Sequence, residues 1–198
     1  MRKSLLVLPL VAVLALTVGC SKPPQADIDA AKASLEQVRA EAAEYAPESL
    51  RAAEDAQAAL EAELKAQEEK FALFRSYKVT GEKVTALKTA SEKAGSDAAA
   101  GKEQAKNEAT TLIQEARTSL QETRDMLDKA PRGKGTAADL ATLKSDLDGH
   151  EAAINEAQAA FDAGRYLEAK TKAEAAKNNV GTVKTEIETA MAAKMGKK

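Results

Sequence analysis

The stretch LATLKSDLDGHEAAINEAQAAF, residues 140–161, carries apolar side chains at alternating intervals of three and four residues. This spacing puts them on one face of an α-helix and is typical of long helices that pack through a narrow seam. Gly164 marks a helix end, and residues 166–191 repeat the spacing. Two helices of nearly equal length joined by so short a turn are expected to form an antiparallel hairpin. The first seam consists of Leu140, Leu143, Leu147, His150, Ile154, Ala157 and Phe161, and the second of Tyr166, Ala169, Ala173, Ala176, Val180, Val183, Ile187 and Met191.

The composition extends this interpretation to the rest of the chain. Charged residues make up 30% of the sequence and aromatic residues only 3%, and there is no Trp. Much of the 44% that counts as hydrophobic is alanine, which buries little apolar area per residue. We therefore expect an all-α fold, an elongated antiparallel bundle of about four to five long, coiled-coil-like helices, rather than a compact globular core.

Two helical regions are expected on either side of a loop at residues 130–135. Residues 26–129 should form a long helical hairpin or rod, and residues 136–195 the C-terminal antiparallel hairpin. Within the first region, a helix should end at Ala46, because Pro47 disfavours the helical conformation of its predecessor. Pro47 also suits the first turn of the helix that follows.

The apolar stripe then continues from residue 47 to about residue 129, with a slip of one residue between Phe74 and Tyr77. It keeps its phase through Gly95, which favours one long helix of roughly 120 Å. A break near Gly95, which would fold the two halves into an antiparallel pair, is the alternative. The small residues at 88–109 predict a close-packed alanine seam, and an exposed rod or partner-binding face is the alternative interpretation.

The N-terminus has the three zones of a bacterial signal peptide, assigned to residues 1–19. Arg2 and Lys3 form a basic start, residues 5–18 are apolar, and small residues lead into Cys20. The apolar run is shorter than the roughly 20 residues that span a bilayer core, so a retained transmembrane helix is the weaker interpretation. Cys20 is the only cysteine, so it cannot form a disulfide within the chain.

Thr17-Val18-Gly19-Cys20 resembles the lipobox of bacterial lipoproteins, although leucine usually stands where Thr17 is. The resemblance implies cleavage before Cys20 and attachment of two or three acyl chains to that residue, with residues 20–25 as a short lipidated tether. Multiple acyl chains give stable anchoring. An ordinary signal peptide whose end happens to contain a cysteine is the alternative.

Ser21 follows the cysteine at the place where lipoproteins retained in the inner membrane usually carry aspartate. The family resemblance therefore implies an outer-membrane location, with the chain facing the periplasm; surface exposure stays open. Of the 29 basic and 31 acidic side chains, only Arg2 and Lys3 lie in the signal segment, so the mature chain is weakly acidic. It has no basic stripe of the kind that binds nucleic acid.

The opening of the second helix, Tyr45-Ala46-Pro47-Glu48-Ser49-Leu50, resembles an alanine-rich helical domain of Gram-negative lipoproteins whose function is unknown. The second half of the chain, from Leu127 to Ala176 and including the turn Gly164-Arg165-Tyr166-Leu167-Glu168-Ala169, is similar to the same proteins. Together the two resemblances cover most of the mature chain. They imply helical structure and a lipid anchor but no activity.

Phe71, Phe74 and Tyr77 bring three of the six aromatic residues into seven positions. If these side chains are exposed, they would form a patch that binds a partner. If they are buried, they are the local core, and this is the interpretation that we favour.

No arrangement of residues predicts catalysis, a metal site or a cofactor. His150 is the only histidine, and only Asp146 shares its helix face, which leaves too few ligands for a zinc site. Without a second histidine or cysteine, the usual nucleophile and base pairs cannot be assembled. We therefore expect no enzyme, and His150 is interpreted as a residue at the edge of a seam.

Two classes of function follow. The first is structural: an outer-membrane lipoprotein that spaces or tethers layers of the cell envelope. In this class, Lys198 resembles the C-terminal lysine by which the major alanine-rich envelope lipoprotein of enteric bacteria is joined to peptidoglycan, although terminal lysines are more often a soluble tail. The second is a lipid-anchored adaptor or chaperone-like helical module that binds another envelope protein.

Overall fold

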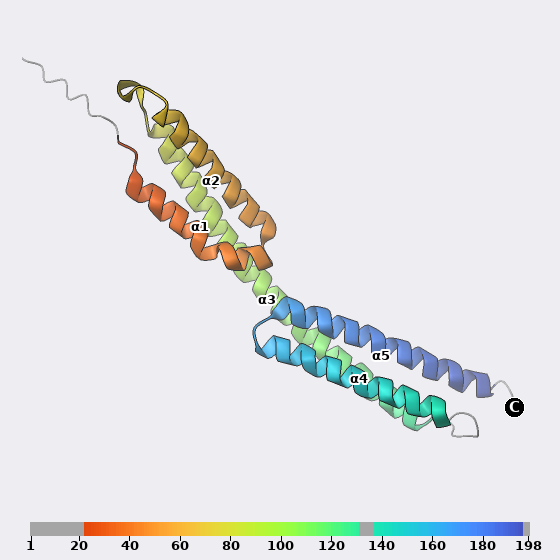
Figure 1. The fold of residues 1–198 in the computed structure, drawn as a ribbon. Coiled ribbons are helices and arrows are strands. Elements are labelled where there is room, and N and C mark those ends of the chain that lie inside the picture. Colours follow the sequence, from red (N-terminus) through yellow and green to blue (C-terminus); the bar gives the residue numbers. More distant parts are fainter. Residues whose placement is uncertain (1–21, 131–136, 196–198) are drawn as a thin grey trace, which may run out of the picture. The chain divides into compact units, whose positions relative to one another are not determined.

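The computed structural model describes residues 22–130 and 137–195, with side chains for residues 22–130 and 140–192. In these residues the chain forms five α-helices and one short 3₁₀ turn, and no strand (Figure 1). The prediction of an all-α fold with long helices is confirmed. The elements are α1 (Gln25–Tyr45), α2 (Pro47–Glu68), η1 (Ala72–Phe74), α3 (Lys78–Asp128), α4 (Ala137–Asp162) and α5 (Tyr166–Met195).

The single helix predicted from residue 47 to about 129 is wrong. Helix α2 ends at Glu68, and residues 69–77 form a connection that contains η1 before α3 begins at Lys78. The alternative break near Gly95 does not occur either, because α3 passes through this position without interruption. The predicted change of helix at Pro47 is confirmed, since α1 ends at Tyr45 and α2 begins at Pro47.

The chain divides into two compact units. Unit 1 contains residues 22–40 and 47–94, and unit 2 contains residues 41–46 and those from Gly95 onward. The division therefore lies within α3 rather than in the loop at residues 130–135.

In unit 1, α1 and α2 run antiparallel. The ammonium group of Lys32 lies 2.9 Å from a carboxylate oxygen of Glu61, and the guanidinium of Arg39 pairs with Glu54. From the first pair to the second, the residue number rises by seven in α1 and falls by seven in α2. The start of α1 therefore lies beside the end of α2. The buried apolar side chains of unit 1 come from α1, α2 and the first part of α3, and they are Ile28, Ala31, Leu35, Leu50, Ala53, Leu60, Val84, Leu87 and Ala94.

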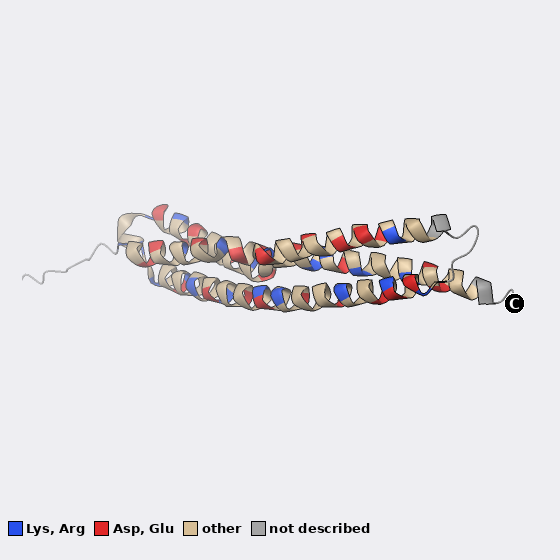
Figure 2. Cartoon of the chain, turned by 90° about the horizontal axis from the view of Figure 1, so that it is seen from below, with Lys and Arg blue, Asp and Glu red and all other residues tan. Residues whose placement is uncertain are grey.

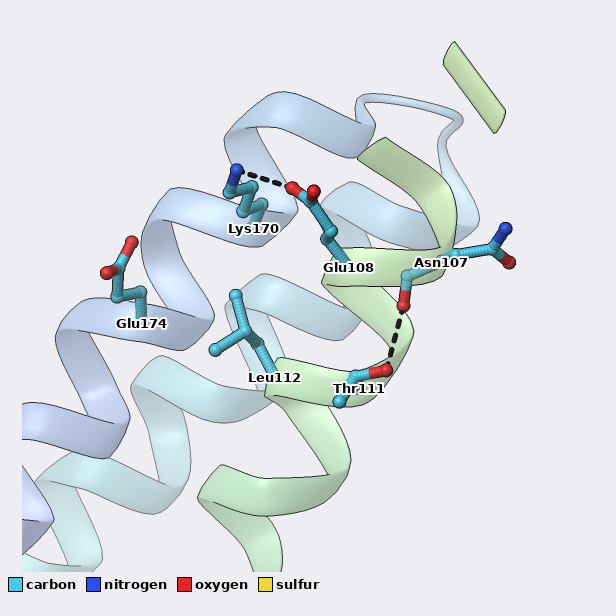
Figure 3. A pocket seen from close by; sticks show the side chains of 6 residues that line it. All are labelled: Asn107, Glu108, Thr111, Leu112, Lys170 and Glu174. Carbon is cyan, nitrogen blue, oxygen red and sulfur yellow. Dashed lines mark hydrogen bonds and ion pairs between the residues drawn. The ribbon is translucent and has the colours of Figure 1, made fainter. Parts of the chain in front are cut away.

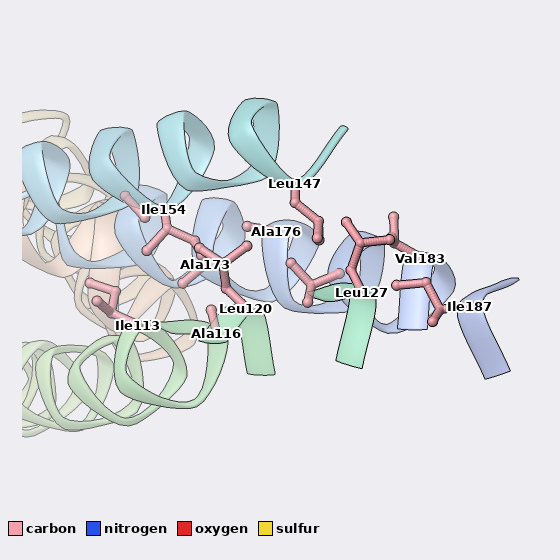
Figure 4. Close-up of a cluster of buried hydrophobic side chains, with 12 residues drawn as sticks. Ile113, Ala116, Leu120, Leu127, Leu147, Ile154, Ala173, Ala176, Val183 and Ile187 are labelled. Carbon is pink, nitrogen blue, oxygen red and sulfur yellow. The ribbon is translucent and has the colours of Figure 1, made fainter. Parts of the chain in front are cut away.

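In unit 2, α4 and α5 pack against each other along their length, with α3 against both (Figure 4). The seams predicted from the sequence are confirmed, because every position in them is buried or half-buried. Leu147, Ile154 and Val180 are among the most completely buried side chains. Figure 4 shows Leu147 and Ile154 in one cluster with Ile113, Leu120 and Leu127 from α3. Val180 belongs to the same cluster.

Three ion pairs fix the register between α3 and α5. Each joins a lysine of α5 to a glutamate of α3 at a constant separation of 62 residues, so the two segments run parallel. The rungs repeat at the interval of a coiled-coil heptad, and they are Lys170–Glu108, Lys177–Glu115 and Lys184–Glu122. Elsewhere, acidic and basic residues are interspersed along the helices (Figure 2).

The turn between α4 and α5 depends on Gly164, whose φ of +77° is in the left-handed region that favours glycine. The amide of Gly164 donates to the carbonyl of Phe161 (2.9 Å), and that of Arg165 donates to the carbonyl of Ala160 (2.9 Å). This is the Schellman arrangement, which satisfies the last carbonyls of a helix. The rings of Phe161 and Tyr166, 5.2 Å apart between centroids, cover the turn.

The small residues of α3 allow close helix packing, as the alanine seam predicted. Ala98, Ala105 and Ala109 are all buried in unit 2. A Cβ atom placed on Gly101 would lie 2.5 Å from the backbone oxygen of Tyr45. Only glycine permits this approach between α3 and the end of α1.

Candidate functional site

The connection at residues 69–77, which we call the tip, is the part of the chain that is least explained by helix packing. It contains neither proline nor glycine, so no backbone preference ends α2. Side chains hold it instead. The guanidinium of Arg75 donates to the carbonyls of Glu68 (2.9 Å) and Lys70 (3.0 Å), and so satisfies carbonyls that the end of a helix leaves without partners.

Gln67 makes a second set of hydrogen bonds at the tip. We call the bonds of Arg75 and Gln67 together the clasp. Its side chain is buried, its amide nitrogen donates to Glu63 Oε1 (2.7 Å), and its oxygen accepts from the backbone amide of Ser76 (3.0 Å). A buried amide with both ends bonded is a costly group to leave without partners. Gln67 therefore ties the far end of the tip back to the last turn of α2.

The clasp displays three large apolar side chains to solvent. Phe71 is 69% exposed, Leu73 is 62% exposed and Phe74 is 75% exposed. The two phenylalanine rings lie against each other, with centroids 6.4 Å apart. The interpretation of Phe71 and Phe74 as local core is wrong, because the helix that would have carried them inward ends before them.

Tyr77 does not belong to this exposed group. It is half-buried and lines a depression of about 680 Å³ with Pro24, Lys78 and Gly81, among others. The tip thus separates the predicted trio: two aromatic rings point to solvent, and the third packs between the first turns of α1 and α3.

Sequence reasoning missed Leu73, Gln67 and Arg75 as parts of this surface. One signal was present: Phe71, Leu73 and Phe74 cannot share a single face of a helix, because residues two apart lie on different sides. The shift of the apolar stripe by one residue after Phe74 also indicated that the helix is interrupted there. Neither signal could show which polar side chains would close it.

The tip has a small excess of positive charge. Within the tip, Lys70 and Arg75 outnumber Glu69. Lys78 follows directly as the first residue of α3, and Lys70 and Lys78 are exposed. The tip is therefore an apolar surface bordered by cations.

A second surface feature lies in unit 2, between α3 and α5 (Figure 3). It is a shallow depression of about 450 Å³ lined by Asn107, Glu108, Thr111, Leu112, Lys170 and Glu174. The hydrogen bond from the Lys170 ammonium lowers the pKa of the Glu108 carboxyl and raises the pKa of Lys170 itself. Because this pair is also a rung of the ion-pair ladder, its role is explained by packing.

The remaining predicted site residues do not form a constellation. His150 is half-buried on α4, at the edge of the seam as predicted. Among the described residues there is no group of three or more His, Cys, Asp or Glu side chains able to hold a metal ion. Cys20 and Lys198 lie outside the described residues.

None of the helices in the described ranges combines the length and the apolar character needed to cross a membrane. No family model, curated protein or solved structure matches the chain.

Proposed function

We propose that this chain is a lipid-anchored lipoprotein of the outer membrane, facing the periplasm, with a structural role as a spacer or tether in the cell envelope. The observation that carries the proposal is the sequence Thr17-Val18-Gly19-Cys20 directly after the apolar run of residues 5–18. Acyl chains on Cys20 would hold the chain permanently at a membrane surface.

The use of side chains in the two units supports a structural role. Their interiors consist of alanine and aliphatic seams, and charged side chains form ion pairs along helix surfaces, as in the ladder between α3 and α5. These are features that stabilise long helices. In its sharper form, the proposal makes Lys198 the point of attachment to peptidoglycan.

A second candidate is a lipid-anchored adaptor or chaperone-like module that binds another envelope protein. The exposure of Phe71, Leu73 and Phe74 favours it, because exposed aromatic residues often form the centre of a protein interface. Alanine at Phe71 and Phe74 would then abolish co-purification of the partner without changing the melting temperature.

The anchor is tested by incorporation of labelled fatty acid in cells that express the full chain, with Cys20→Ala as the matched control. The proposal expects label in the wild-type protein, none in Cys20→Ala, and sedimentation of the wild type with outer membranes. Absence of label from the wild type, or equal label in both, would refute the anchor. Since Ser21 stands at the sorting position, Ser21→Asp should move the labelled protein to the inner membrane.

A further inference from the structure

The tip is built to hold apolar side chains in water, which is unfavourable unless something covers them. Phe71, Leu73 and Phe74 are each more than half exposed. Arg75 and Gln67 hold the backbone that carries them with three hydrogen bonds of 2.9 to 3.0 Å. A fourth bond, from the Gln67 side-chain nitrogen to Glu63 (2.7 Å), orients Gln67 itself. The apolar surface is therefore displayed in a fixed conformation.

The tip lies at the end of unit 1 where α1 begins (Figure 1). The ion pairs Lys32–Glu61 and Arg39–Glu54 set α1 and α2 antiparallel, which brings the first turn of α1 beside the last turn of α2. Pro24 lines the same depression as Tyr77 and Lys78, the residues that follow η1. The first described residues of the chain and the tip are thus neighbours.

Cys20 is separated from Pro24 by only a few residues. At a reach of about 3.5 Å per residue, an acylated Cys20 would lie within about 14 Å of Pro24. Lipid chains on Cys20 would therefore bring the same end of unit 1 to the membrane surface and keep the tip there at high effective concentration.

We propose that the tip is a membrane-docking element that inserts Phe71, Leu73 and Phe74 into the interface of the leaflet that holds the acyl chains. The proposal rests on acylation of Cys20, and it adds a second contact beside the covalent one. A single tether leaves unit 1 free to rotate, whereas a tether and an inserted tip together fix the direction in which α1 and α2 leave the membrane.

The chemistry of the tip suits this occupant. Backbone groups that enter an apolar medium without partners are costly, and Arg75 already occupies the carbonyls of Glu68 and Lys70. Exposed Lys70 and Lys78 can extend their charged ends to lipid phosphates while their aliphatic stems stay near the apolar region. A protein partner would have to compete with lipid that the anchor places beside the tip.

The absence of tryptophan from the sequence permits a direct test. Phe74→Trp replaces one exposed aromatic residue by another, and Phe71→Trp is the substitute if Phe74→Trp fails to fold. Ala52→Trp is the matched control, because Ala52 is exposed on α2 and lies about 24 Å along that helix from Glu68. Each full-length variant, purified with its acyl chains from membranes, is reconstituted into vesicles of phosphatidylethanolamine and phosphatidylglycerol, with and without bromine on the lipid chains.

The proposal expects brominated lipid to quench the Phe74→Trp emission and shift it to shorter wavelength, and to leave Ala52→Trp unchanged. Emission from Phe74→Trp that is unquenched and unshifted would overturn the proposal. A shift without quenching would also overturn it, in favour of a protein contact at the tip. The intact mass of the same sample separates the two claims: acylated protein with unquenched tryptophan refutes only the tip, and protein without acyl chains refutes the anchor.

Discussion

Gly101 offers the sharpest test of the packing in unit 2. A Cβ atom added to this residue would lie 2.5 Å from the backbone oxygen of Tyr45 and 3.3 Å from the Tyr45 Cβ. Carbon and oxygen do not approach so closely without a bond, and a backbone atom cannot move aside as the end of a flexible side chain can. Gly101→Ala must therefore push α3 away from the end of α1.

The cost can be isolated by two matched substitutions. Gly149 and Gly181 also lie inside helices, and a Cβ on either one meets no atom within 4 Å. Alanine at these positions should stabilise the chain by about 0.5–1 kcal/mol, because it restricts the unfolded backbone and favours helix. Gly101→Ala has the same gain, but overpacking should cost about 1–3 kcal/mol.

The assay is urea unfolding followed by circular dichroism, with all three variants measured together. We expect Gly101→Ala to be less stable than Gly149→Ala and Gly181→Ala by about 1–3 kcal/mol. For a chain of this size each kcal/mol moves the melting temperature by about 2–4 °C. If the three variants are equally stable, the close approach of α3 to Tyr45 does not exist and the packing of this segment is wrong.

The remaining predictions concern the tip and the ion pairs. Alanine at the exposed Phe71 and Phe74 should change the free energy of unfolding by less than about 0.5 kcal/mol. The control Leu60→Ala, at a fully buried position, should lower it by about 2–5 kcal/mol. Comparable losses in a urea titration would mean that the aromatic residues are core. Gln67→Ala removes both bonds of its half of the clasp and should cost about 1–3 kcal/mol, with faster amide exchange in residues 69–77; unchanged exchange would contradict the clasp. Lys170 bonds Glu108 and lowers the pKa of this carboxyl in the folded chain. The ion pair therefore stabilises the fold at neutral pH, and this stabilisation is lost as the pH falls through the lowered pKa of Glu108. Melting temperatures of wild type and Glu108→Gln should therefore converge on acidification, and a gap that stays constant down to acid pH would argue against the pair.

Much of the fold could be predicted because its determinants are local. The seams of α4 and α5 follow from leucine, isoleucine and valine at heptad spacing, as Leu147, Ile154 and Val180 illustrate. Pro47 ends one helix and begins the next through its own backbone chemistry. Gly164 turns the chain because it adopts a positive φ. Each of these signals can be interpreted without knowing what lies nearby.

The break after Glu68 could not be predicted in the same way. Its causes are hydrogen bonds made by Gln67 and Arg75, two residues that are common inside helices. Their role depends on bonds across the connection to Ser76 and to the end of α2. Local helix propensity therefore predicted a continuous helix, whereas hydrogen bonds between residues several positions apart end it.

The sequence predicted only part of the exposed surface at the tip, because burial also depends on contacts that are distant in the sequence. The clustering of Phe71 and Phe74 singled them out, but aromatic residues on a helical stripe are usually core, so burial was favoured. Whether a side chain is buried depends on where the neighbouring helices end, and the sequence does not contain that information locally. Leu73 was overlooked because it lies off the stripe, although it lies between the two phenylalanines in the sequence and is exposed with them.

Whether the chain is a lipid-anchored envelope protein can be decided from the intact mass of the protein extracted from its native membranes, with and without prior muramidase digestion. We expect a mass equal to residues 20–198 plus acyl chains. Muropeptide on Lys198 after digestion would establish the tether form of the proposal, and a free C-terminus would remove that form while leaving the anchor. A chain that carries no acyl group at Cys20 would refute the lipid anchor.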